Sequence, residues 1–198
     1  NCVGAPYDTE VDSAAVDAAR DRLARPGVEI RPRLQWPTGM ANLGIDLSGR
    51  ITDGPATGRA IGRLTDLGWG VRLRRLLSGV DEPVPADVLS ATVAVLAAWP
   101  WESRPVAVMG VDSSTHPVLI GSLVDGIAKV GRLRNLGTLR YRPDRRPVAA
   151  ANSAYRVRAL EDSWVAPDLG GVVGPILLVD DETDTGWTFT MAARVLRR

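Results

Sequence analysis

The chain has 198 residues, of which 45% are hydrophobic, and a formal net charge of +1. It is long enough for one large or two small domains, each with a buried core. No apolar run approaches the roughly 20 residues that span a bilayer, and no signal peptide opens the sequence, so we expect a cytoplasmic location and no membrane partner. The single cysteine, Cys2, excludes an internal disulfide framework.

Charge is unevenly distributed along the chain. Residues 132–158 contain eight arginines and one acid, whereas residues 161–184 contain seven acids and no base. Lys129 is the only lysine, a bias that is typical of a GC-rich genome such as that of an actinobacterium. Arginine also suits phosphate recognition better than lysine does. The arginine run is therefore either a phosphate-binding segment or a solvated loop that balances the acidic segment.

The first 37 residues predict a helix, a strand and an extended segment. Residues 11–24 have helical spacing, with Asp12 as the cap. Residues 28–33 alternate between apolar and charged side chains, and Pro32 restricts them to an edge strand. Residues 31–37 are extended, basic and contain one tryptophan. They either follow a phosphate backbone or tether the chain across the next helices.

The next part of the chain is predicted to be mainly helical. Residues 58–67, 69–77 and 86–99 carry apolar side chains at helical spacing, and residues 81–85 link the last two helices. Three arginines lie on the exposed face of the middle helix: Arg72, Arg74 and Arg75. Helices with a short strand in a basic setting fit a small, winged-helix-like domain over residues 28–101.

After residue 104 the pattern changes to alternating strands and helices. Strands are predicted at 105–111, 136–140 and 175–179, and helices at 117–130 and 188–196. Residues 141–151 form a basic loop, and residues 152–160 are a strand or a loop. This alternation predicts an α/β domain with an open parallel sheet over residues 102–198.

One strand-to-helix connection has the pattern of an anion site. The apolar run 176–179 ends at Asp180 and Asp181, and a polar loop with Thr185, Gly186 and Thr188 leads into the last helix. Loop amides and a helix N-terminus attract phosphate. The two carboxylates can accept hydrogen bonds from a ribose diol and lie near a magnesium ion.

This stretch resembles the phosphoribosyl pyrophosphate (PRPP) loop of type I phosphoribosyltransferases. The resemblance implies that residues 180–188 bind phosphate and ribose, with possible magnesium. A complete member of that fold has another strand and usually a hood that grips the base, so we expect that this chain is trimmed or that its end is disordered. Trp187 fills a position where small residues are common, and it either covers the sheet end or stacks on a base. The corresponding pyrophosphate loop, residues 111–116, has no fixed cation, and Asp112 would repel the anion by about 4 kcal/mol at about 4 Å. His116 is either a general acid or a solvated helix-start residue. We therefore expect no catalysis.

A second resemblance covers nearly the whole chain. The segments RPRLQWPTGM, GRLTDLGWG, VLAAWPWESRPV, GRLRNLGTL, NSAYR and LLVDDETDTGWT resemble the C-terminal region of actinobacterial RecQ-like ATP-dependent DNA helicases. It implies that residues 1–27 are the tail of a zinc module and a linker helix, with Cys2 as a zinc ligand that needs upstream cysteines. Zinc and Mg-ATP would belong to the parent protein. This fragment has no phosphate-binding motor loop, so we expect no cofactor here.

Two functions follow as hypotheses. The first is an accessory, nucleoid-associated helicase region that contacts single-stranded or tailed DNA, or the motor domains of the same parent chain. Its candidate DNA-binding residues are Arg72, Arg74, Arg75, Arg132, Arg134, Arg140, Tyr141, Arg142, Arg145 and Arg146, with Tyr141 stacking on an unpaired base. The alternative is a phosphoribosyltransferase or sensor that binds PRPP or a nucleotide.

Overall fold

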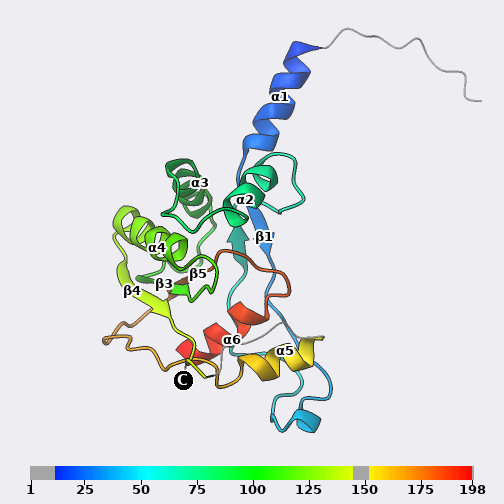
Figure 1. The fold of residues 1–198 in the computed structure, drawn as a ribbon, viewed down its shortest axis with the longest axis vertical. Helices are drawn as coiled ribbons and strands as arrows, with labels where there is room; N and C mark the ends of the chain where they lie inside the picture. The colour runs from blue at the N-terminus through cyan, green and yellow to red at the C-terminus, as the bar shows by residue number, and fades with distance from the viewer. Residues whose placement is uncertain (1–11, 145–151, 198) are drawn as a thin grey trace, which may run out of the picture.

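A three-stranded parallel sheet forms the centre of the molecule. The computed structural model describes residues 12–144 and 152–197. The strands are β3 (Ala107–Val111), β4 (Arg134–Leu139) and β5 (Ile176–Val179), in the order β4-β3-β5 (Figure 1). All five residues of β3 are buried, because a central parallel strand is covered on both faces. The predicted parallel α/β arrangement is therefore confirmed.

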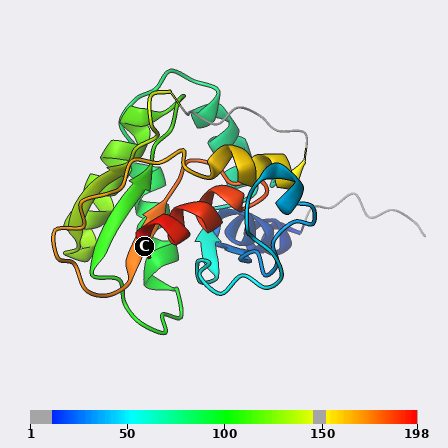
Figure 2. The same cartoon turned by 90° about the horizontal axis from the view of Figure 1, so that it is seen from below.

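Helices cover the two faces of this sheet. Helix α4 (Pro117–Gly131) lies on one face, and α6 (Trp187–Leu196) and α5 (Ser153–Leu160) lie on the other (Figure 2). Side chains alternate between the faces with the strand period of two. Val108 and Leu177 pack with α4, whereas Met109 and Leu178 pack with α6.

The N-terminal half packs against both layers. It contains α1 (Ser13–Ala24), β1 (Val28–Ile30), the short 3-10 helix η1 (Ala41–Leu43), β2 (Gly58–Ala60), α2 (Trp69–Leu77) and α3 (Ala86–Ala97). Strands β1 and β2 pair antiparallel, and α1 extends away from the body (Figure 1). Trp36 and Met40 join the core beneath α6, while Leu89 and Leu96 of α3 pack with α4. The division at residue 102 stays a prediction.

Two predicted elements are wrong. Residues 58–67 are not a helix: Gly58–Ala60 is a strand, and the carboxylate of Asp66 then accepts a hydrogen bond from the amide of Arg63 at 2.8 Å, which forms a turn. Residues 152–160 were expected to be a strand or loop, but they form α5. Asn152 caps this helix by accepting from the amide of Tyr155 at 3.1 Å.

Other local predictions are confirmed. Asp12 caps α1 by accepting from the amides of Ala14 and Ala15. The helix predicted at 69–77 matches α2, and Asp180 follows the last residue of β5. Across residues 12–144 and 152–197, no helix has the length and apolar character that crossing a bilayer requires.

Candidate functional site at the carboxyl edge of the sheet

The two loops singled out in the sequence meet at one edge of the sheet. Strands β3 and β5 are parallel, with Gly110 opposite Val179, so they end side by side. Residues 112–116 follow β3, and Asp180 and Asp181 follow β5. Open α/β sheets generally bind ligands at this carboxyl edge.

Side chains from the first loop hydrogen-bond directly to the acid pair. Ser113 Oγ donates to Asp181 Oδ2 at 2.7 Å, and His116 Nδ1 lies 3.1 Å from the same oxygen. Thr115 Oγ1 lies 2.9 Å from His116 Nδ1. His116 is at the helix start but is only 7% exposed, so the expectation of a solvated residue is wrong. We call Ser113, Thr115, His116 and Asp181 the edge cluster.

The amides that could hold a phosphate are also bonded within the protein. Ser113 Oγ accepts from the amides of Thr115 at 3.3 Å and His116 at 3.0 Å. The carboxylate of Asp81 accepts from the amides of Val118 and Leu119, at 2.8 and 3.0 Å. Pro117 has no N–H. A phosphate at the start of α4 would therefore have to replace existing hydrogen bonds.

The acid pair carries less charge than its sequence suggests. Burial, and to a smaller extent the negative charge of Asp181, raise the pKa of Asp180 from 3.8 to about 8, although the Asp181 amide, which donates to Asp180 Oδ1 at 3.0 Å, acts in the opposite direction. Asp180 is therefore mainly protonated at neutral pH. A protonated carboxyl is a poor ligand for magnesium, which prefers charged oxygens.

The loop before α6 is held by the N-terminal segment. Gly186 adopts φ 75° at the cap of α6, and the carbonyl of Thr185 accepts from Arg33 Nε at 2.6 Å. The Arg33 guanidinium carbon also lies 5.1 Å from the centre of the Trp187 ring. Segment 31–37 thus contacts this loop and the start of α6, a contact that neither interpretation of the segment predicted.

Trp187 covers the sheet end. It is 3% exposed and stacks with Trp36, at 6.1 Å between ring centres and 15° between planes. Its rings could reach a base only after a rearrangement. Thr188 Oγ1 accepts from Arg156 Nη2 at 3.4 Å, so this hydroxyl is also in use.

The predicted DNA-binding arginines differ in how they are held. Arg72 forms a two-point ion pair with Asp87, at 2.8 and 3.1 Å, and its hydrogen bond holds the pKa of Asp87 below its usual value. Arg134 donates to the carbonyl of Gly170 at 2.7 Å. Both guanidinium groups are therefore already engaged within the protein.

The remaining predicted residues are more accessible. Among residues 12–144 and 152–197, no carboxylate pairs with Arg74, Arg75, Arg132 or Arg140, and all four are exposed.

Arg142 is also exposed, and its Nε donates to the carbonyl of Trp164 at 3.0 Å. Tyr141 stacks on Trp164 with 4.1 Å between ring centres. Helix α2 lies in the upper half of Figure 1 and the end of β4 in the lower half, so these arginines do not form one patch. Arg145, Arg146 and Cys2 lie outside the described residues.

Several contact residues were missed from the sequence. Asp81 lies in the predicted linker 81–85, and the sequence did not indicate that Asp81 caps α4 or that Ser113 bonds to Asp181. The only available signal was the convergence of two strand ends, which places their loops together without specifying the bonds.

In the described ranges, no group of three His, Cys, Asp or Glu side chains could hold a metal ion.

The fold and site define a mixed α/β protein with an acidic pair at the carboxyl edge of a parallel sheet. No protein-family model, curated protein or solved structure matches this chain.

Proposed function

We propose that this chain is an accessory, non-catalytic region of a RecQ-like ATP-dependent DNA helicase. In this proposal, a phosphoribosyltransferase-like domain serves as a platform that contacts DNA or the motor domains, and its sugar-phosphate site no longer turns over substrate. The sequence resemblance provides the helicase context. The edge cluster provides the argument against catalysis.

The hydrogen bond between Ser113 Oγ and Asp181 Oδ2, at 2.7 Å, is the observation that carries the proposal. PRPP spans the distance between an acid pair and a pyrophosphate loop, so a working site must leave these two elements apart for the ligand. Here they bond to each other, and the loop supplies no cation. Turnover would require breaking the bond and burying additional negative charge beside Asp181.

The DNA-contact part rests on arginines that lack a carboxylate partner among the described residues. A surface arginine paired with an acid has its charge largely compensated, whereas an unpaired one can neutralise a phosphate and release a counterion. Arg74, Arg75, Arg132 and Arg140 meet this condition, and Arg72 does not.

The test is the salt dependence of binding to a single-stranded oligonucleotide. We expect Arg140→Gln and Arg74→Gln each to reduce the slope of log affinity against log salt by about 0.7 to 1. Arg72→Gln is the matched control on the same helix as Arg74, and it should change the slope less. If the affinity for the oligonucleotide changes neither with salt concentration nor with any of the three substitutions, DNA contact is refuted.

The alternative, a PRPP- or nucleotide-binding sensor, keeps one observation in its favour. Asp180 and Asp181 do follow a parallel strand, and α6 begins six residues after Asp181. If PRPP with magnesium binds, a concentration of 100 times its dissociation constant should stabilise the fold by about 2.7 kcal/mol in thermal unfolding. We expect no such shift, and observing one would favour the sensor.

A further inference from the structure

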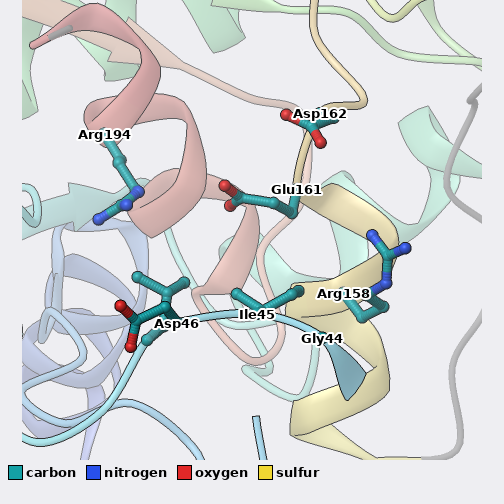
Figure 3. A pocket seen from close by; sticks show the side chains of 8 residues that line it. Gly44, Ile45, Asp46, Arg158, Glu161, Asp162 and Arg194 are labelled. Atoms are coloured by element: carbon teal, nitrogen blue, oxygen red, sulfur yellow. The ribbon is translucent and has the colours of Figure 1, made fainter. Parts of the chain in front are cut away.

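A cavity of about 380 Å³ lies between the segment after η1, the C-terminal end of α5 and the second half of α6 (Figure 3). The lining residues are Gly44, Ile45, Asp46, Leu47, Arg158, Glu161, Asp162 and Arg194. Arg194 Nη1 already donates to Asp53 Oδ2 at 2.7 Å, and Glu161 and Asp162 each take part in an interaction. The side chains around this cavity therefore assign no ligand.

The amino edge of the sheet, opposite the edge cluster, exposes apolar side chains. Val106 precedes β3 and is 44% exposed, Val130 in the last turn of α4 is 57% exposed, and Val173, three residues before β5, is 91% exposed. Single exposed apolar residues are common on protein surfaces, but several at one place indicate an interaction surface.

The chain brings these three valines together. A Cβ on Gly174 would lie 3.1 Å from Val106 Cγ2, so the segment that carries Val173 passes directly beside Val106. The carbonyl of Val106 accepts from the amide of Arg134 at 3.0 Å, and Arg134 is only four residues after Val130. The three side chains therefore belong to one surface.

Helix α3 runs alongside α4 toward the same surface. Before α3, the amide of Val84 donates to Ser122 Oγ at 2.7 Å. Within α3, Leu89 packs so closely on α4 that a Cβ on Gly126 would lie 2.8 Å from Leu89 Cδ1. Both helices thus run in the same direction, and the residues after α3 lie near the end of α4.

A stacked tryptophan pair follows α3. Trp99 and Trp101 are half-buried, with 4.2 Å between ring centres and 20° between planes, and they pack against the same core cluster as Leu133. The indole N–H of Trp101 donates to a carbonyl of α3 at 2.9 Å, which fixes this ring. We call Trp99, Trp101, Val106, Val130 and Val173 the amino-edge patch.

Cations surround this patch. Arg104 lies between the tryptophans and Val106 in the chain, Lys129 is in the last turn of α4, and Arg132 follows that helix. All three are exposed, and their side chains form no hydrogen bond or ion pair with any residue in the described ranges. Their charges are therefore available to a partner.

Acids near the patch are more often engaged. Asp168 lies beside the guanidinium of Arg134, because the two bind the amide and the carbonyl of one glycine. Asp125, farther back on α4, accepts from the side chain of Asn135 at 2.6 Å. Glu102 is exposed and has no partner among residues 12–144 and 152–197. An apolar centre with a mainly basic rim is complementary to an acidic, apolar partner.

We propose that the amino-edge patch binds a peptide segment of a partner protein in which apolar side chains lie next to aspartate or glutamate. The apolar side chains cover the valines, and the acids pair with Arg104, Lys129 and Arg132. Single-stranded DNA would match the cations, but it would leave the valines uncovered, because nucleic acids bind mainly through phosphates and base stacking. This proposal does not depend on DNA contact.

The experiment selects binders of the 198-residue chain from a display library of random 12-residue peptides and measures the affinity of the enriched peptides by fluorescence anisotropy. We expect the enriched sequences to combine acidic with aliphatic or aromatic residues, and their affinity to fall as salt rises. The absence of enrichment, or enrichment of peptides without acids, would overturn the proposal.

Substitutions in the patch locate the binding. Val130→Ser and Val173→Ser should each weaken the peptide about fivefold, and Lys129→Gln about threefold at low salt. Val80→Ser is the matched control, because Val80 is 81% exposed but lies next to Asp81, which binds the opposite end of α4, and it should leave the affinity unchanged. The valines carry no charge, so the oligonucleotide salt slope should stay as in the parent chain.

Two results would identify a different occupant. If Val130→Ser weakens a single-stranded oligonucleotide but no selected peptide, the patch binds nucleic acid. If sedimentation shows a dimer for the parent chain and a monomer for Val130→Ser, a second copy of the chain occupies the patch. Either result, or unchanged peptide affinity in both valine variants, contradicts the proposal.

Discussion

The carboxyl edge of the sheet and the cavity beside Arg194 both place carboxylates next to α6, yet they differ in what those carboxylates do. At the edge, Asp181 accepts from Ser113 and lies beside His116, and Asp180 is mainly protonated. At the cavity, Asp46 has no partner among the described residues and faces open volume.

This difference shows that an acidic motif at a strand end is not sufficient for a ligand site. A ligand needs polar groups whose hydrogen bonds are still unmade, because replacing an existing internal bond brings little net free energy. The recognisable motif lies where those groups are satisfied. Asp46, which has no hydrogen bond or ion pair with any described residue, lies in a segment that no motif marked.

The largest expected effect comes from removing the tryptophan that covers the carboxyl edge of the sheet. Trp187 is 3% exposed and stacks with Trp36, so Trp187→Ala should lower the free energy of unfolding by about 3–5 kcal/mol through lost burial and the remaining cavity. Urea unfolding measures this. Tyr155→Ala is the aromatic control, since Tyr155 is 54% exposed and should cost well under 1 kcal/mol. Equal effects would mean that Trp187 does not cover the edge.

A smaller effect is expected from opening the edge cluster. Ser113→Ala removes the donor to Asp181 and the acceptor for two amides, and leaving such buried groups unpaired should cost about 1–3 kcal/mol in the same unfolding assay. The neighbouring Ser114 is exposed, so Ser114→Ala should change stability by no more than about 0.5 kcal/mol. If both variants unfold alike, Ser113 does not hold the two loops together.

The third prediction concerns Asp180, for which the expected change in the free energy of unfolding is smallest when it is expressed per pH unit. Its pKa in the folded state, about 8, exceeds its ordinary value of 3.8, so between these values the folded chain binds more protons than the unfolded chain. Stability should therefore fall as pH rises from about 4 to 8, by at most about 1.4 kcal/mol per pH unit from this group. Asp180→Asn should remove that part of the slope. Asp184→Asn, at an exposed position, should leave it, and a slope unchanged in Asp180→Asn would contradict the buried, protonated state.

Local signals identified much of the fold. The apolar runs around Val108 and Leu177 predicted buried parallel strands, and Asp12 predicted a helix start. The failures at residues 58–67 and 152–160 have local causes as well. In residues 58–67, the hydrogen bond from the Arg63 amide to the Asp66 carboxylate forms a turn, although the apolar spacing is helical. In residues 152–160, the Asn152 cap begins a helix although the apolar periodicity is weak.

The sequence by itself determined the parallel strands, the Asp12 cap and the position of Asp180 and Asp181 after β5, because these depend on apolar periodicity and on hydrogen bonds within a few residues. Only the tertiary structure decided whether the acid pair was open. Ser113 and Asp181 are 68 positions apart, and Arg33 and Thr185 are 152 positions apart. Such contacts leave no periodic pattern, since they form only when packing brings distant loops together.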